Sequence, residues 1–163
     1  IGPMGAGKTA VGRVLAGILH YEFYDSDHEV EKQLGADISW IFDLEGESGF
    51  RKREAAVIDE FTQKDNIVLA TGGGCVITKE NRDVLIKRGF VVYLSISLEE
   101  QFERVKRSKH RPLLLNDDPL AVLTQLSETR EPLYNNTADL VYDTTSQKVP
   151  IIAQAIIDSL NEG

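Results

Sequence analysis

The sequence has almost no cysteine and a shortage of basic residues. Cys75 is the only cysteine among 163 residues, so no disulfide can form within the chain, and a reducing compartment is compatible. The 18 basic residues are outnumbered by 26 acidic ones, which argues against a general nucleic-acid-binding protein with a basic face. No hydrophobic run approaches the roughly 18 residues that a membrane helix needs. We therefore expect a cytoplasmic protein that has neither a nucleic-acid nor a membrane partner.

Hydrophobic and charged residues are both present at ordinary levels. They make up 42% and 27% of the chain, close to the average for globular proteins, which excludes a disordered or fibrous chain. A chain of 163 residues can build one hydrophobic core without disulfides or metal sites. We expect a single domain that spans residues 1–163.

Short β-type runs alternate with helical patterns along the chain, which is typical of a parallel sheet with helices on both faces. The β-type runs are 22–24, 67–70, 90–94 and 140–142. The predicted helices are 9–19, 28–34, two segments within 38–63, 81–87, a segment from a Ser97–Glu100 capping box to Arg107, one that starts at Asp118-Pro119 and ends near Arg130, and 150–160. Gly35 is the predicted C-terminal stop of the second helix.

The N-terminal segment Gly2–Thr9 matches the phosphate-binding pattern G-x-x-x-x-G-K-[ST]. In such a loop the backbone N–H groups surround phosphate oxygens, the lysine reaches the β- and γ-phosphates, and the hydroxyl binds Mg²⁺. The strand that should precede the loop is represented only by Ile1, so we expect further residues upstream. The predicted ATP-binding residues of this segment are Gly5, Ala6, Gly7, Lys8 and Thr9, with Thr9 also a metal ligand.

Two further segments supply candidates for an acceptor site. Asp25 and Asp27 follow a β-type run, where ligands of open α/β sheets bind; Asp25 suits the metal and its waters, and Asp27 suits an acceptor hydroxyl. A surface cap for the following helix is the alternative. The consecutive cations Arg51, Lys52 and Arg53 cannot all point the same way on a helix, so one can face a pocket while the others face water.

A triple glycine and a long loop complete the set. Three glycines within Thr71–Cys75 would let the backbone approach a ligand closely, although a plain tight turn is the alternative. The segment 108–118 is the most loop-like, and its Arg111 could close over phosphates as part of a mobile lid. Arg107 and Arg130 stand outside this loop and could equally be surface residues.

Together these strings closely resemble the shikimate kinase family over nearly the whole chain. The strings that carry the resemblance are Gly2–Thr9, Phe23–Asp27, Glu45–Arg51, Thr71–Gly74, Arg111–Leu114 and Arg130 ahead of Pro132-Leu133-Tyr134. The resemblance implies a nucleoside-monophosphate-kinase-like α/β fold, a three-layer sandwich with a five-stranded parallel sheet in the order 2-3-1-4-5 and a lid at about 108–118. It also implies a substrate-binding region at about 26–54.

The resemblance further implies transfer of the ATP γ-phosphate to the 3-hydroxyl of shikimate, on the way to chorismate and aromatic amino acids. Mg²⁺ would be the cofactor, ATP the co-substrate and the protein a monomer. The implied catalytic residues are Asp27, Lys8 and Arg111, and the implied shikimate-binding residues are Asp27, Arg51, Gly73, Gly74 and Arg130. Asp25 would hold the metal through water, and Arg107, Arg111 and Gln147 would contact ATP.

Two other functions are compatible with part of the pattern. Another small-acceptor kinase, for gluconate or a nucleoside monophosphate, would share the phosphate-binding loop. A regulatory nucleotide-binding domain without turnover would share it too, but would have no need of Asp27 or Arg111.

Overall fold

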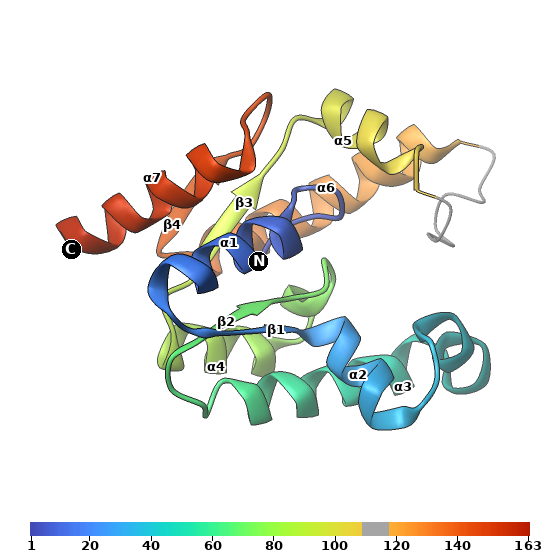
Figure 1. The fold of residues 1–163 in the computed structure, drawn as a ribbon. Helices are drawn as coiled ribbons and strands as arrows, with labels where there is room; N and C mark the ends of the chain where they lie inside the picture. Colours follow the sequence, from blue (N-terminus) through green and yellow to red (C-terminus); the bar gives the residue numbers. More distant parts are fainter. Residues whose placement is uncertain (109–117) are drawn as a thin grey trace.

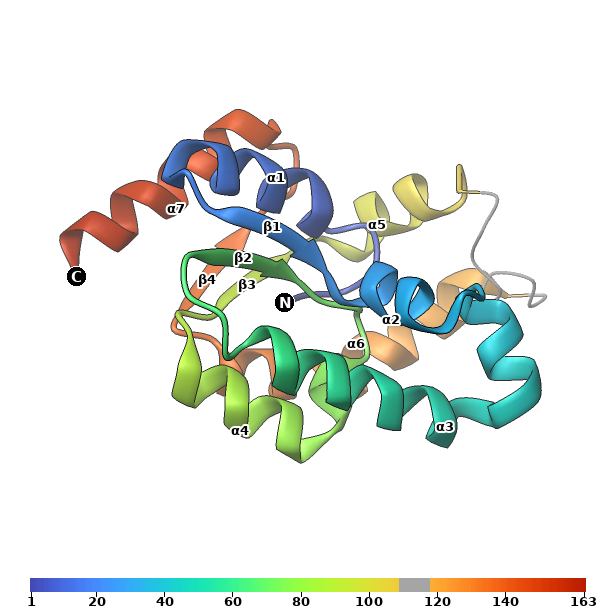
Figure 2. The same ribbon diagram turned by 60° about the horizontal axis from the view of Figure 1, so that its bottom comes forward.

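Four short strands lie between two layers of helices in the computed structural model, which describes residues 1–108 and 118–163 (Figures 1 and 2). The strands are β1 (Glu22–Asp25), β2 (Ile67–Ala70), β3 (Val92–Ser95) and β4 (Leu140–Asp143). β1 pairs in parallel with β2, and β3 pairs in parallel with β4, so the described residues form two two-stranded sheets. The predicted α/β class is confirmed, and the predicted β-type runs match these strands.

The helices form the outer layers and the ends of the molecule. Figure 2 shows α1 and α7 on one side of the strands, with α3 and α4 on the other. The helical elements are α1 (Lys8–Leu19), α2 (Ser26–Leu34), α3 (Ile38–Phe61), the short 3₁₀ turn η1 (Cys75–Ile77), α4 (Lys79–Arg88), α5 (Leu98–Val105), α6 (Pro119–Thr137) and α7 (Val149–Glu162). No helix in the described ranges is both long enough and apolar enough to cross a membrane.

Hydrophobic clusters lie on both sides of the strands because successive side chains point to opposite faces. On β3, Val92 and Leu94 pack against the core that contains α1 and α7. Tyr93 faces the other way and packs with Leu85 of α4 and Tyr134 of α6. This alternation produces the three layers that the sequence predicts.

Local signals in the sequence fix several helix ends. Gly35 adopts a left-handed φ of 65° at the end of α2, and Asp118 accepts a hydrogen bond from Ala121 N ahead of the proline that opens α6. Gly46, with φ 69° and ψ −177°, divides α3 into the two helical segments that the sequence predicts. The substrate-binding region proposed at 26–54 therefore includes a bend of the chain at Gly46.

The predicted capping box of α5 is half right. Ser97 Oγ accepts a hydrogen bond from Glu100 N at 3.3 Å, as expected. The Glu100 carboxylate, however, pairs with Arg104 and accepts from Ser146 N at 2.7 Å, while Ser97 N donates to Thr145 Oγ1 at 2.9 Å. Glu100 thus connects α5 to the turn after β4 instead of closing its own cap.

The helix that starts at Pro119 does not end near Arg130. It continues through Pro132 to Thr137, even though proline removes one helical hydrogen bond at a cost of about 3 kcal/mol. The added turn places Tyr134 and Thr137 in the interior, at 2% and 3% exposure. Burial of this turn offsets the cost of Pro132, since packing rather than propensity supplies most helix stability in proteins.

Ile1 lies beside β3. Its amino group donates to Val92 O at 2.8 Å, and its carbonyl accepts from Leu94 N at 2.9 Å. These two bonds alternate as they do in a parallel ladder, and they aim the segment that follows at the carboxyl ends of the strands.

Candidate active site

A cavity of about 660 Å³ opens at the carboxyl ends of β1 and β2. Several residues predicted from separate parts of the sequence line it together: Lys8, Thr9, Asp25, Asp27, Gly72 and Gly73. The carboxyl ends of parallel strands are where open α/β sheets bind ligands. The structure thus brings the phosphate-binding loop, both aspartates and the triple glycine to one cleft.

The phosphate-binding loop depends on glycine at two turns. Gly5 and Gly7 have φ values of 82° and 92°, which other residues adopt only with strain. Gly7 is also the N-cap of α1 and supplies no side chain to its N–H groups. Lys8 and Thr9, the first residues of α1, line the cleft, so the positive end of the helix opens to it, as an anion site requires. Lys8 Nζ donates to the carbonyls of Gly2 at 2.7 Å and Pro3 at 2.8 Å, so its ammonium lies over the loop.

Thr9 and Asp25 place two oxygen ligands side by side. Thr9 Oγ1 donates to Asp25 Oδ2 at 2.9 Å. The other carboxylate oxygen accepts from Asp27 N at 3.0 Å and from His28 N at 3.3 Å, which fixes its orientation. Asp25 is therefore a helix cap, as the alternative interpretation holds, and it also faces the cleft.

These two residues fit Mg²⁺. Magnesium binds oxygen ligands, keeps several waters and takes one or two carboxylates together with substrate phosphates. Within the described residues there is no cluster of three or more carboxylate, histidine or cysteine ligands. A site built from Thr9, Asp25, waters and phosphate oxygens matches that sparse protein contribution.

Asp27 is the most perturbed carboxylate of the cleft. Burial, followed by the charge of Asp25, raises its pKa to about 6, although Lys8 and Arg51 act in the opposite direction. Its Oδ1 atom is buried and has no hydrogen-bond partner in the described part of the chain. A carboxylate with a free oxygen and a pKa near neutrality is suited to receive a proton from a hydroxyl.

Arg51 is held by two glutamates on its own helix. Its Nη1 donates to Glu54 Oε1 at 2.9 Å and its Nη2 to Glu47 Oε1 at 3.3 Å. The Arg51 side chain is 16% exposed and that of Glu54 is fully buried. Burial raises the pKa of Glu54 to about 7, against the lowering influence of Arg51. The guanidinium is therefore oriented before any ligand arrives.

The neighbouring cations point elsewhere, as the helical spacing predicts. Lys52 is exposed, and Arg53 forms an exposed pair with Glu45 at 2.6 Å. Arg51 alone among the three consecutive cations reaches the triple glycine, where a Cβ on Gly74 would lie only 2.2 Å from its Nη2.

The triple glycine approaches charged side chains at its first and last positions. A Cβ on Gly72 would lie 2.6 Å from Asp27 Oδ1, and one on Gly74 would collide with Arg51. Gly72 N donates to the buried Ser26 Oγ at 3.0 Å, which joins the ends of β2 and β1. At Gly72 and Gly74 a side chain would therefore displace Asp27 or Arg51 from the position that each has here.

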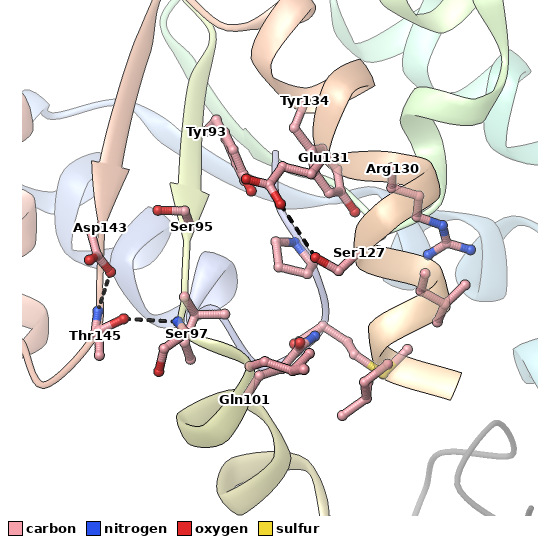
Figure 3. A pocket seen from close by; sticks show the side chains of 16 residues that line it. Tyr93, Ser95, Ser97, Gln101, Ser127, Arg130, Glu131, Tyr134, Asp143 and Thr145 are labelled. Atoms are coloured by element: carbon pink, nitrogen blue, oxygen red, sulfur yellow. Dashed lines mark hydrogen bonds between the residues drawn. The ribbon is translucent and has the colours of Figure 1, made fainter. Parts of the chain in front are cut away.

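Arg130 comes to the same loop from α6. A Cβ on Gly73 would lie 3.7 Å from Arg130 Nη1. Arg130 also lines a second cavity of about 240 Å³ between the ends of β3 and β4 and the helices α5 and α6 (Figure 3). Tyr134, one turn further along α6, donates its phenol hydrogen to the carbonyl oxygen of Gly73. Arg130 and Arg51 therefore approach the triple glycine from different helices.

Helix α5 contacts the back of the phosphate-binding loop through residues that the sequence analysis did not select. Arg104 Nη1 donates to Gly5 O at 3.0 Å, and Gln101 Nε2 donates to Met4 O at 2.9 Å. Glu100 holds Arg104 with one carboxylate oxygen. A helical face shared by Gln101, Arg104 and the buried Val105 was the available signal.

The remaining predicted ATP contacts lie less centrally. Arg107 is exposed and stands beyond Val105, where α5 ends. Gln147 is exposed in the turn after β4, with its N–H bonded to Thr144 O at 3.1 Å. Arg111 and most of the predicted lid lie outside the described residues.

Comparison with known proteins identifies the family. A sequence model described as shikimate kinase matches residues 4–161. The chain belongs to the shikimate kinase family. Shikimate kinases from Pseudoalteromonas atlantica and Legionella pneumophila are 55% and 58% identical to it, over 99% and 98% of this chain and 95% and 91% of theirs.

A solved shikimate kinase has nearly the same fold. The structure of the Acinetobacter baumannii enzyme in complex with shikimate superposes with a TM-score of 0.96 at 47% identity, covering 99% of this chain and 90% of that one. The chain is thus a phosphotransferase with the α/β kinase fold of shikimate kinases, as the resemblance implies.

Proposed function

We propose that this chain transfers the γ-phosphate of ATP to the 3-hydroxyl of shikimate and releases shikimate 3-phosphate and ADP. The observation that carries the assignment of roles is one cleft that holds both halves of the reaction. Lys8 and Thr9 line it on the phosphate side, and Asp27 lines it on the acceptor side. Arg51 stands beside Asp27 with its fork oriented by two glutamates.

The phosphate-binding loop holds the nucleotide. Backbone N–H groups of Gly5, Ala6 and Gly7 surround the phosphates, and Lys8 shifts from the carbonyls of its own loop to the β- and γ-phosphates. Thr9 and, through water, Asp25 would hold Mg²⁺, since their oxygens lie side by side. The metal neutralises charge on the phosphate oxygens when it is bound.

The acceptor end is built for a small carboxylate that also bears hydroxyls. Arg51 and Arg130 offer planar forks, the geometry that matches a carboxylate with two parallel bonds. The triple glycine lies against both arginines, and the N–H groups of Gly73 and Gly74 would bind the acceptor. Asp27 then faces the hydroxyl that reacts.

The transfer needs positioning and charge neutralisation more than covalent chemistry by the protein. The shikimate oxygen forms a bond to the γ-phosphorus, while the bond from that phosphorus to the β,γ-bridging oxygen breaks. The hydroxyl proton passes late to Asp27, whose unpartnered oxygen is available for it. Lys8 compensates the negative charge that develops on ADP.

We also propose that the two strand pairs occupy the outer positions of the five-stranded order 2-3-1-4-5. That order counts the N-terminal segment as strand 1, at the centre, so β1 and β2 are its strands 2 and 3, and β3 and β4 are its strands 4 and 5. The bonds of Ile1 to β3 support this placement. The whole chain would then be one kinase domain, with 26–54 as its substrate-binding region.

A substrate panel tests the proposal directly. ADP release is measured with Mg-ATP and, in turn, shikimate, gluconate and AMP. We expect turnover with shikimate only. Turnover with gluconate or AMP instead would assign the cleft to another acceptor, and ATP binding without turnover on any of the three would favour a regulatory domain.

Replacing Arg51 by lysine should weaken the binding of shikimate rather than that of ATP. Lysine keeps the charge but loses the fork, so the KM for shikimate should rise about tenfold or more, the effect of roughly one charge-assisted hydrogen bond. Arg53→Lys is the matched control. It is the same substitution two positions further along the helix, at an arginine that forms an exposed pair with Glu45. Steady-state kinetics measure the KM of each variant for both substrates. An equal rise of the ATP and shikimate KM values in Arg51→Lys would contradict the assignment of Arg51 to the acceptor.

We expect Arg104 to support the binding of ATP rather than that of shikimate. Arg104→Ala removes the bond to Gly5 O and a positive charge that lies against the phosphate-binding loop, so the KM for ATP should rise about tenfold while that for shikimate changes little. Arg107→Ala is the comparison, since it removes an exposed arginine three positions later. A larger effect from Arg107→Ala would return the ATP contact to the residue that the sequence first indicated.

A further inference from the structure

Tyr134 is a buried residue that the proposed mechanism does not use. Its side chain is 2% exposed, and its ring stacks on Tyr93 with 4.9 Å between centroids and 26° between planes. Its phenol is turned away from this hydrophobic cluster, because it donates a hydrogen bond to the carbonyl oxygen of Gly73. A buried phenol needs a hydrogen-bond partner, and for Tyr134 that partner is the triple glycine.

The contact joins two parts of the proposed acceptor site. Tyr134 and Arg130 are four residues apart on α6, so their side chains share one face of the helix. Arg130 comes within 3.7 Å of the Cβ position of Gly73, and its charge also acts on the phenol of Tyr134. One helical face therefore presents both the guanidinium and a fixed bond to the glycine loop.

The geometry of the peptide group carries this contact on to the next residue. The carbonyl of Gly73 and the N–H of Gly74 belong to one planar trans peptide and point in opposite directions. A donor on the carbonyl side therefore fixes the direction of the N–H. Among the described residues no group accepts a hydrogen bond from the Gly74 N–H.

We propose that Tyr134 is a positioning residue for the acceptor: its phenol holds the Gly73–Gly74 peptide so that the Gly74 N–H and Arg130 meet shikimate in a fixed relation. Without this bond, three consecutive glycines would leave the loop with the greatest conformational freedom a backbone can have. Ordering that loop before binding lowers the entropy lost when the acceptor arrives. This inference rests on the proposed function, since it takes shikimate as the acceptor.

The test is Tyr134→Phe, which removes one oxygen and keeps the stacked ring. We expect the KM and the calorimetric Kd for shikimate to rise about fivefold to tenfold, the loss of roughly one hydrogen bond. The KM for ATP should stay within about twofold. Amide hydrogen exchange over residues 71–75 should also accelerate, because the loop has lost one of its anchors and keeps the bond from Gly72 N to Ser26.

Tyr93→Phe is the matched control. It removes a phenol oxygen from the neighbouring ring, which stacks on Tyr134. Among the described contacts the oxygen of Tyr93 makes none with the glycine loop, whereas that of Tyr134 bonds Gly73. We expect wild-type shikimate affinity and wild-type exchange over 71–75. Thermal unfolding of both variants shows whether either one has lost general stability.

The outcomes separate this inference from the function on which it rests. If the wild-type chain fails to phosphorylate shikimate, the proposed function is wrong. If the wild type is active but Tyr134→Phe binds shikimate as tightly, Tyr134 is not a positioning residue. The same conclusion follows if Tyr134→Phe weakens ATP and shikimate equally, or if Tyr93→Phe has the same effect.

Discussion

Asp27→Asn should be nearly inactive and yet more stable than the wild type at pH 7. The amide cannot accept the hydroxyl proton, so kcat should fall by about a hundredfold to ten-thousandfold, the usual contribution of a general base. The gain in stability has a different origin. The Asp27 carboxylate is buried, and its Oδ1 has no partner among the described residues, so its ionised form is costly in the folded state.

The pH dependence of that stability follows from the raised pKa. The pKa of Asp27 is about 6 in the folded protein against 3.8 for an unperturbed aspartate, so ionisation favours the unfolded chain. The cost is complete above pH 6, shrinks as the pH falls and disappears below about pH 4. At pH 7 it is on the order of 1 to 3 kcal/mol. The neutral amide of Asp27→Asn avoids this cost at every pH.

Thermal unfolding from pH 4 to pH 8 measures the effect. The variant should melt several degrees above the wild type at pH 7, and the difference should close towards pH 4. Asp65→Asn, an exposed aspartate in the turn after α3, is the matched control and should change neither activity nor stability. A variant with normal kcat would remove Asp27 from the reaction, and one that melts lower at pH 7 would show that its charge is stabilised in the fold.

The residues of the phosphate-binding loop could be predicted because their chemistry is local. The spacing from Gly2 to Thr9 requires a turn followed by a helix, and α1 begins at Lys8 as that pattern predicts. The same holds for Gly35 and Asp118, whose roles depend on the backbone next to them. Short-range signals of this kind do not depend on how distant elements pack.

Residues whose roles depend on distant packing were harder to find. Arg104, Lys106 and Arg107 look alike in the sequence, and only the end of α5 at Val105 and its contact with the loop distinguish Arg104. Tyr134 appeared only as part of a family string, because the proline at 132 suggested that the helix had already ended. Its contact with Gly73 spans 61 residues of sequence, and no local sequence pattern predicts such a contact.

The orientation of Arg51 lies between these cases. Helical spacing predicts that Arg51, Lys52 and Arg53 diverge, but it does not say which one faces the site. The choice is made by Glu54, which is fully buried and pairs with Arg51 at 2.9 Å. A buried glutamate three residues after an arginine is thus the signal that identifies the inward cation, and burial is what the sequence alone does not report.

Lys8→Ala should abolish most turnover while the fold survives. The ammonium of Lys8 is the cation that the phosphate-binding loop itself carries over the site, held by the carbonyls of Gly2 and Pro3. Its loss leaves the charge that develops on the β- and γ-phosphates uncompensated, so kcat/KM should fall by about a hundredfold to thousandfold. The helix that follows begins at Lys8 but is capped by Gly7, so α1 should persist.

Circular dichroism, thermal unfolding and the ADP-release assay together check this expectation. Lys79→Ala is the control, because Lys79 is an exposed lysine on α4 whose ion pair with Asp83 is 71% and 57% exposed. It should leave both the spectrum and the rate unchanged, since exposed pairs of this kind contribute little. A folded Lys8→Ala with near-normal activity would mean that the loop is not the phosphate site. An unfolded one would mean that the two carbonyl bonds of Lys8 hold the loop together, and the transfer would then have to be tested with Lys8→Met, which keeps most of the side-chain length without the charge.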